Sequence, residues 1–213
     1  MTKQVFTVGH STHSIDTFLR LLSSHQIQVV ADVRSSPFSR FNPQFNREQL
    51  QDSLREVGIR YVFLGKELGA RSDDPACYVN DKVQYEKLAR TDLFQSGLAR
   101  IIEGASSYQI AMMCAEKDPL DCHRTILVAR ELEKSEHEIK HILANGRVEK
   151  HSDSMARLVA QLEIPEDDMF RSREDMIADA YAKQAEKIAY DRSARQTRTV
   201  EQDGDSIEVG AIR

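Results

Sequence analysis

The most reactive side chains of this sequence gather in one short stretch, residues 108–124, which reads YQIAMMCAEKDPLDCHR. Cys114 stands at the end of the apolar run Ile110–Met113, which predicts a buried strand, and Glu116 follows closely. Cys122 opens the helix that is expected next, with a histidine and an arginine directly after it. Thiols, a carboxylate, an imidazole and a guanidinium on one strand-to-helix connection indicate chemistry more than packing.

Cys122 is better placed than Cys114 to be a reactive thiol. Asp121 can cap the helix, which would put Cys122 in its first turn, where the helix dipole and free backbone N–H groups favour a thiolate. Free cysteines are also among the most buried residue types, so plain core thiols are the alternative interpretation. A redox role would use a disulfide between Cys114 and Cys122, although their spacing is not C-x-x-C. Cys77 is expected to be an incidental loop thiol.

The elements that would carry these groups alternate along the chain. The apolar runs that predict strands are Val5–Val8, Ile27–Ala31, Ile59–Leu64, Ile110–Met113 and Ile139–Leu143. Amphipathic segments between them predict helices, so we expect an α/β fold with an open, mainly parallel sheet of about five strands and helices on both faces. This domain would span residues 1–150, followed by a C-terminal helical extension at 151–190 and a disordered tail at 191–213.

Residues with capping side chains predict where several helices begin. Ser14, Asn46 and Ser152 each precede an amphipathic segment. Ser172 with Asp175 has the spacing of a reciprocal cap and predicts the start of the last helix. Between these elements, residues 34–46 and 65–80 are too polar and broken for regular structure. Long loops of this kind are often functional.

Ligands of an open parallel sheet bind beyond the carboxyl ends of its strands, and polar residues follow every predicted strand here. His10 is the preferred general acid or base, because Gly9 before it lets the backbone approach a ligand. Asp32 could orient an imidazole, and Arg34 and Arg124 could hold a phosphate or carboxylate; ion pairs are their alternative role. The predicted catalytic residues are Cys122, Cys114, His10, Asp32 and Glu116, and the predicted substrate-binding residues are Arg34, Arg124, Ser11, His123, Ser39 and Arg40.

Motifs along the chain resemble one known family. They are GHST at Gly9–Thr12, DVRSSPFSR at Asp32–Arg40, LGKELG at Leu64–Gly69, CAE at Cys114–Glu116 and CHR at Cys122–Arg124. In order and spacing they resemble the bacterial and archaeal domain-of-unknown-function family DUF488, over roughly residues 5–146; Ala70 departs from the glycine usual there. The resemblance implies an uncharacterised cytoplasmic family whose paired cysteines suggest enzymatic activity. A weaker likeness to rhodanese-type domains is a fold-level analogy only, because their short cysteine cradle is absent.

The composition limits the class of function. A net charge of −5 argues against a nucleic-acid binder driven by bulk charge. An odd number of cysteines without a signal peptide predicts a reducing cytoplasm, and the absence of a long apolar run predicts no membrane span. We therefore expect a cytoplasmic thiol-dependent transferase, hydrolase or redox enzyme that acts on a small anionic substrate and needs no cofactor. The oligomeric state does not follow from the sequence.

Two other functions have some support in the sequence. A nucleic-acid-binding or repair-associated accessory module would use residues 34–47, in which arginines alternate with phenylalanines that could stack on bases. The alternative is that residues 34–47 are a loop with no binding role, which its phenylalanines attach to the domain. A metal-dependent site, for zinc or iron, would use Cys114, Cys122, His123 and His10 as a tetrahedral set, although the spacing is not that of a zinc finger.

Overall fold

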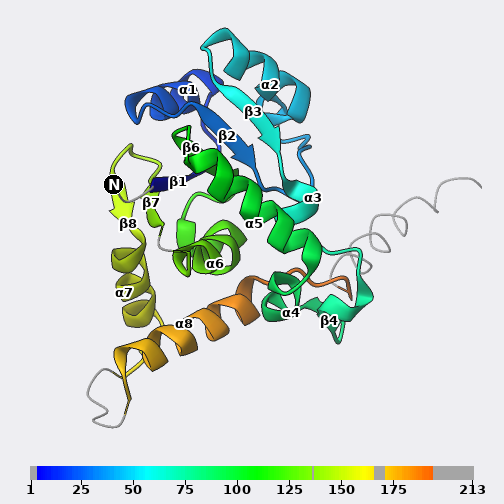
Figure 1. The fold of residues 1–213 in the computed structure, drawn as a ribbon, viewed down its shortest axis with the longest axis vertical. Helices are drawn as coiled ribbons and strands as arrows, with labels where there is room; N and C mark the ends of the chain where they lie inside the picture. The colour runs from blue at the N-terminus through cyan, green and yellow to red at the C-terminus, as the bar shows by residue number, and fades with distance from the viewer. Residues whose placement is uncertain (1–3, 136, 166–170, 194–213) are drawn as a thin grey trace, which may run out of the picture.

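Six β-strands form the central sheet, in the order β3-β2-β6-β1-β7-β8. The computed structural model describes residues 4–135, 137–165 and 171–193 (Figure 1). The strands are β1 (Gln4–Gly9), β2 (Val29–Asp32), β3 (Arg60–Phe63), β6 (Ile110–Cys114), β7 (Glu138–Ile142) and β8 (Val148–Lys150). All neighbouring pairs are parallel except β7 and β8. The α/β prediction is confirmed, with one strand more than the five expected.

Helices cover both faces of the sheet, as predicted. On one face of the sheet, α1 (Ile15–Ser24) and α2 (Arg47–Glu56) pack against the strand side chains that point to that face and bury an apolar core. On the other face lie α5 (Asp92–Ala105), α6 (Arg130–Glu133), α7 (His151–Gln161) and α8 (Arg173–Ile188), which share a second core (Figure 1). The inner strands β1, β2 and β6 are buried on both sides because each contributes residues to the two cores, whereas the edge strand β3 is partly exposed.

Short elements lie in the two stretches predicted to be loops, residues 34–46 and 65–80, and directly after the second one. They are η1 (Pro43–Phe45), α3 (Gly65–Leu68), η2 (Pro75–Cys77), and a two-stranded hairpin of β4 (Tyr78–Val79) and β5 (Lys82–Val83). α4 (Tyr85–Ala89) follows the hairpin, and η3 (Pro119–Asp121) and η4 (Arg124–Ala129) lie between β6 and α6. The predicted loop status of these stretches is therefore only partly right.

The capping predictions have mixed outcomes. The Ser14 hydroxyl accepts a hydrogen bond from the Thr17 backbone, and Ser172 and Asp175 form the predicted capping box of α8. The prediction that Ser152 caps the next helix is wrong, because α7 already includes Ser152 and its N-cap residue is Lys150. None of the described helices is long and apolar enough to cross a membrane. Most of the predicted tail, from residue 194 onward, lies outside the described residues.

Candidate functional site

The carboxyl ends of β1 and β6 hold the loop that carries the reactive residues. His10 N donates to the Cys114 carbonyl at 2.9 Å, and Ser11 N donates to the Ala115 carbonyl at 2.9 Å. A Cβ atom at Gly9 would lie 1.9 Å from the Glu116 carbonyl oxygen. Only glycine therefore lets the loop after β6 lie this close to the end of β1.

Cys114, Cys122 and His123 converge at the start of this loop and of the helical segment after it. His123 Nδ1 lies 3.7 Å from Cys114 Sγ and 3.9 Å from Cys122 Sγ. Both cysteines are free thiols, and each is at most 3% exposed. The sequence placed these residues together correctly, although they come from different ends of a loop.

A hydrogen bond to the backbone fixes the orientation of the His123 ring. Its Nε2 lies 3.0 Å from the Val33 carbonyl oxygen, which can only accept a hydrogen bond. Nε2 therefore carries a proton, and Nδ1 faces the two sulfurs. In the neutral ring Nδ1 is an acceptor, and in the charged ring it donates to a thiolate.

Cys122 precedes the helical segment instead of lying in its first turn. Its backbone is extended, with φ −135° and ψ 138°, and its Sγ accepts a hydrogen bond from Arg124 N at 3.4 Å. The cysteine itself thus occupies the capping position that we predicted for Asp121, which instead ends η3. A sulfur bonded to a free helical N–H group is still favoured as a thiolate.

The ionisable groups of the cluster titrate together. Burial raises the pKa of Cys122, but hydrogen bonding from Cys114 and the positive charges of Arg124 and His123 outweigh it and bring that pKa well below its usual value. The pKa of Cys114 lies well above its usual value, through burial and then through the charge on Cys122. Burial likewise opposes protonation of His123, yet Cys122 raises its pKa. The cluster therefore favours one thiolate, on Cys122.

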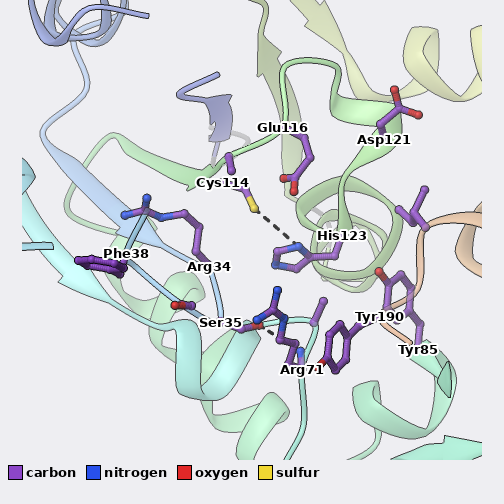
Figure 2. A pocket seen from close by; sticks show the side chains of 14 residues that line it. Arg34, Ser35, Phe38, Arg71, Tyr85, Cys114, Glu116, Asp121, His123 and Tyr190 are labelled. Atoms are coloured by element: carbon purple, nitrogen blue, oxygen red, sulfur yellow. Dashed lines mark hydrogen bonds between the residues drawn. The ribbon is translucent and has the colours of Figure 1, made fainter. Parts of the chain in front are cut away.

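Glu116 adds an acidic group to the cluster. Its Oε2 lies 2.9 Å from Cys122 Sγ, and withdrawal of the carboxyl from water, followed by the negative charge of Cys122, raises the pKa of Glu116. The residue as a whole is exposed, but its carboxyl group turns inward beside Cys114 and His123 (Figure 2). Glu116 can therefore hold a proton next to the thiol pair.

A cavity of about 350 Å³ opens beside this cluster (Figure 2). Cys114, Glu116 and His123 line one side of it, while Cys122 lies behind them and does not line it. The remaining lining residues are Arg34, Ser35, Ser36, Phe38, Ala70, Arg71, Tyr85, Ala115, Asp121, Ile188 and Tyr190. Cys114 is thus the sulfur that a ligand in the cavity would meet.

Asp32, Arg34 and His10 form a buried network at the edge of the cavity. The Arg34 guanidinium donates to both carboxylate oxygens of Asp32, at 2.9 and 2.7 Å, and Tyr61 donates to the same carboxylate at 2.8 Å. Arg34 Nη1 lies 3.2 Å from His10 Nε2, and His10 Nδ1 lies 2.9 Å from the Ser11 carbonyl. The ion pair that the sequence offered as the alternative for Arg34 is therefore present.

His10 is held as a neutral ring and does not support the predicted role of general acid or base. Both of its ring nitrogens have partners, and its ring stacks on Phe45 with centroids 4.3 Å apart. Burial, and then the charge of Arg34, lower the pKa of His10 to about 4. His10 does not line the cavity, and it positions Arg34.

Arg124 also differs from its prediction as an anion clamp. It is 0% exposed, and its Nη1 donates to the Glu116 carbonyl at 2.9 Å. Its Nη2 lies 3.5 Å from the Lys117 carbonyl. The guanidinium thus supports the loop from beneath and contributes charge to the thiol pair, without reaching a ligand in the cavity.

The other predicted binding residues lie away from the cavity. Ser39 accepts hydrogen bonds from Phe41 N and Asn42 N, so it closes a turn, and the Arg40 guanidinium covers the Phe41 ring at 5.2 Å. Ser11 lines a separate, open cavity of about 800 Å³. The structure therefore does not bring these three residues together with the thiols.

Arg71, Tyr85 and Tyr190 are among the lining residues that the predicted site did not include. Arg71 follows β3 in the sequence and lies over the Tyr190 ring at 4.6 Å. Tyr85 points its hydroxyl toward His123 (Figure 2), and burial and then nearby negative groups raise its pKa. The strand-end pattern could have selected Arg71, but no local signal identifies Tyr85 or Tyr190.

The cluster also has the residue types of a metal site. One ligand atom from each of Cys114, Cys122 and His123 lies within 4.8 Å of the others. The fourth predicted ligand, His10, is not among them, because Arg34 and the Ser11 carbonyl hold its ring nitrogens. Three of the four ligands predicted from the sequence are therefore close together in the structure, and His10 is not.

Comparison with known proteins yields one match. A family model described as a domain of unknown function, DUF488, matches residues 14–130. No curated protein and no solved structure matches the chain. The matched range includes the thiols, Glu116, His123 and Arg71, but it ends before α7 and α8.

Proposed function

This chain belongs to the DUF488 family, whose function is unknown, and we propose from the site itself that it is a thiol-dependent enzyme acting on a small anionic substrate. The observation that carries the proposal is the thiol pair beside the cavity: Cys114 faces the ligand space, and Cys122 behind it has the lowered pKa. A reduced thiol pair suits the cytoplasm, which we propose as the location.

The proposed roles follow from the position of each group. Cys114 attacks an electrophilic centre of the substrate, and its proton passes to the thiolate of Cys122, whose Sγ lies within 4.8 Å of Cys114 Sγ. The bond from the electrophilic centre to its leaving group breaks. The leaving group takes a proton from Glu116, whose raised pKa keeps it protonated to higher pH than an ordinary carboxyl group.

Arg71 is the proposed contact for the anionic group. It lines the cavity, and within the described part of the chain no carboxylate pairs with its guanidinium, which rests on the Tyr190 ring. Arg34 lines the cavity too, but Asp32 already neutralises it. A free guanidinium prefers phosphate or carboxylate groups, which it can hold through two hydrogen bonds.

A matched pair of alkylating reagents tests this proposal without knowledge of the substrate. Iodoacetate carries a carboxylate and iodoacetamide is its neutral counterpart. On metal-free reduced protein we expect iodoacetate to modify Cys114 faster relative to iodoacetamide than it modifies a free cysteine. Mass spectrometry of the digested protein gives the rate at each thiol.

Variants assign the effect to the proposed residues. Arg71→Gln should remove the preference for iodoacetate. Cys122→Ser should move the pH profile of alkylation at Cys114 to lower pH, because the neighbouring negative charge that raises the pKa of Cys114 is lost. Cys77→Ser is the control, since Cys77 lies in the core and does not line the cavity. A Cys114 that reacts like a free thiol, with a midpoint near pH 8.5 and no reagent preference, would refute the proposal.

A second function, binding of single-stranded nucleic acid, is favoured by one observation. Phe38, which lines the cavity, and Phe41 are 71% and 81% exposed, so these two phenylalanines do not attach the loop to the domain. Residues 33–47 contain no acidic side chain, and exposed aromatic rings beside arginines stack on bases. A gel-shift series in rising salt tests this, and no shift at low salt counts against binding.

A further inference from the structure

The thiol pair and His123 have a geometry that the proposed thiol chemistry does not require. In a tetrahedral zinc site the bonds are about 2.3 Å to sulfur and 2.0–2.1 Å to nitrogen, which puts neighbouring ligand atoms roughly 3.5–3.8 Å apart. His123 Nδ1 lies 3.7 Å from Cys114 Sγ and 3.9 Å from Cys122 Sγ. These distances are long for a hydrogen bond and close to those between two ligands of one ion.

The surroundings of the three ligands are those of a metal site as well. A metal-binding histidine donates its second ring N–H to a carbonyl or carboxylate, and His123 Nε2 lies 3.0 Å from the Val33 carbonyl. Cys122 Sγ accepts the Arg124 backbone N–H, which stabilises a coordinating thiolate. The orientation of both side chains is therefore set before any ion binds.

We propose that Cys114, Cys122 and His123 bind a thiophilic divalent cation of the zinc class. Two thiolates balance the charge of the ion, and a set of two sulfurs and an imidazole selects zinc over hard cations such as magnesium. The three residues leave a fourth position that faces the cavity, because Cys114 and His123 both line it. Three protein ligands with one open position are the pattern of catalytic zinc sites.

Glu116 places a carboxyl group beside the three ligands and also lines the cavity. Its Oε2 lies 2.9 Å from Cys122 Sγ, and its carboxyl group turns toward the same space (Figure 2). A carboxylate there can bind the ion directly or accept a proton from a bound water. Zinc would thus convert the site from a thiol nucleophile to a centre that activates water or polarises the substrate.

Titration of the full-length reduced protein with Zn²⁺ and Co²⁺, after removal of metal with a chelator, tests the inference. We expect one equivalent of either ion to bind, Co²⁺ to show thiolate-to-metal charge-transfer absorption, and Zn²⁺ to protect Cys114 and Cys122 from iodoacetamide. Cys114→Ser and Cys122→Ser should each weaken Zn²⁺ binding by about tenfold or more, since loss of even an outer-shell partner costs that much. Cys77→Ser is the matched control and should bind normally.

Three results would overturn the inference: no charge-transfer band, no protection of the two thiols, or Zn²⁺ binding unchanged in both serine variants. Circular dichroism of each variant shows whether it is folded. Should Cys122→Ser unfold, Cys114→Ser alone decides, because its side chain faces the cavity. The reagent preference of the metal-free protein is a separate measurement, so a protein without zinc affinity can still be a thiol enzyme.

Discussion

The 2.9 Å contact between Cys122 Sγ and Glu116 Oε2 requires a proton. A thiolate and a carboxylate at that distance would repel each other, and neither could donate. The shifts of the two groups agree on where the negative charge resides, because the pKa of Cys122 is lowered and that of Glu116 is raised. The proton therefore stays on Glu116 more than an ordinary carboxyl group would allow.

Replacing Glu116 tests how its charge acts on Cys114 at high pH, once the carboxyl group has lost its proton. In Glu116→Gln the negative charge that raises the pKa of Cys114 is lost, so the pH profile for alkylation of Cys114 by iodoacetamide should move to lower pH. Asp121→Asn is the matched control, since Asp121 also lines the cavity but is not among the groups that raise the pKa of Cys114. A profile that stays in place or moves to higher pH in Glu116→Gln would contradict this coupling.

Residue types and strand ends were enough to locate the thiols, Glu116 and His123 in one site. They were not enough to separate residues that face the cavity from residues that build it. Arg124 and His10 have the same chemistry as true ligand contacts, but their hydrogen bonds go to backbone carbonyls and to Arg34. Whether a residue faces the cavity or supports it depends on the direction of its side chain. Tertiary packing sets that direction, and the spacing of residues in the sequence does not reveal it.

At the scale of elements, the end of α8 and the residues after it close one side of the cavity. Val83 N donates to the Tyr190 carbonyl at 2.9 Å, and Arg192 N donates to the Asp81 carbonyl at 2.9 Å, so this segment runs beside the β4–β5 hairpin. The Arg192 guanidinium lies 3.5 Å from the centroid of the Tyr78 ring. Gln184 on α8 donates to the Leu120 carbonyl at 2.8 Å and so reaches η3, in the loop of the site.

Arg192→Ala should loosen this contact without unfolding the sheet. The variant loses the stacking on Tyr78 and a hydrogen bond to the Ser72 carbonyl. We expect faster amide hydrogen exchange at Val83, whose N–H bonds to Tyr190, and no change at Met112 in the central strand β6. Lys187→Ala on the exposed side of α8 is the control. Unchanged exchange at Val83 would show that Arg192 does not hold the segment.

Most of the main elements could be predicted, because their signals are local. Each of the five parallel strands overlaps one of the apolar-rich runs in the sequence, and Ser14 and Ser172 cap helices as expected. β8, with the sequence VEK, is a short edge strand that only its pairing with β7 reveals. Ser152 does not cap α7, which begins at His151; the His151 ring is buried between His141 and Tyr181, at 2.9 and 2.6 Å. That contact brings together residues far apart in the sequence.

For the whole molecule, the buried histidines with lowered pKa values predict how stability depends on pH, while the raised pKa of His123 acts in the opposite direction. Burial lowers the pKa of His151 to about 4, and burial with the charge of Arg34 does the same for His10. The unfolded chain, with histidines near pKa 6.5, binds more protons than the folded chain between these values. The free energy of unfolding should therefore be highest above about pH 6.5 and decrease as the pH falls toward about 4.

Urea unfolding across this pH range measures the effect, and His151→Gln should make the dependence less steep. His25→Gln is a suitable control, because His25 is only partly buried at the end of α1. A protein whose unfolding free energy rises as the pH falls from neutral would show that His10 and His151 do not remain neutral in the folded state.

The closure of the cavity by the end of α8 has a consequence for how the protein is made. A ribosome delivers the thiols, Glu116 and Arg71 well before it delivers Tyr190, since chains emerge from the amino terminus at about 5–20 residues per second. Until Ile188 and Tyr190 have been added, the cavity lacks the side that they provide, so the thiol pair would be open to metals and oxidants on that side. The order of translation thus leaves a short interval in which the site can be loaded or damaged from the open side.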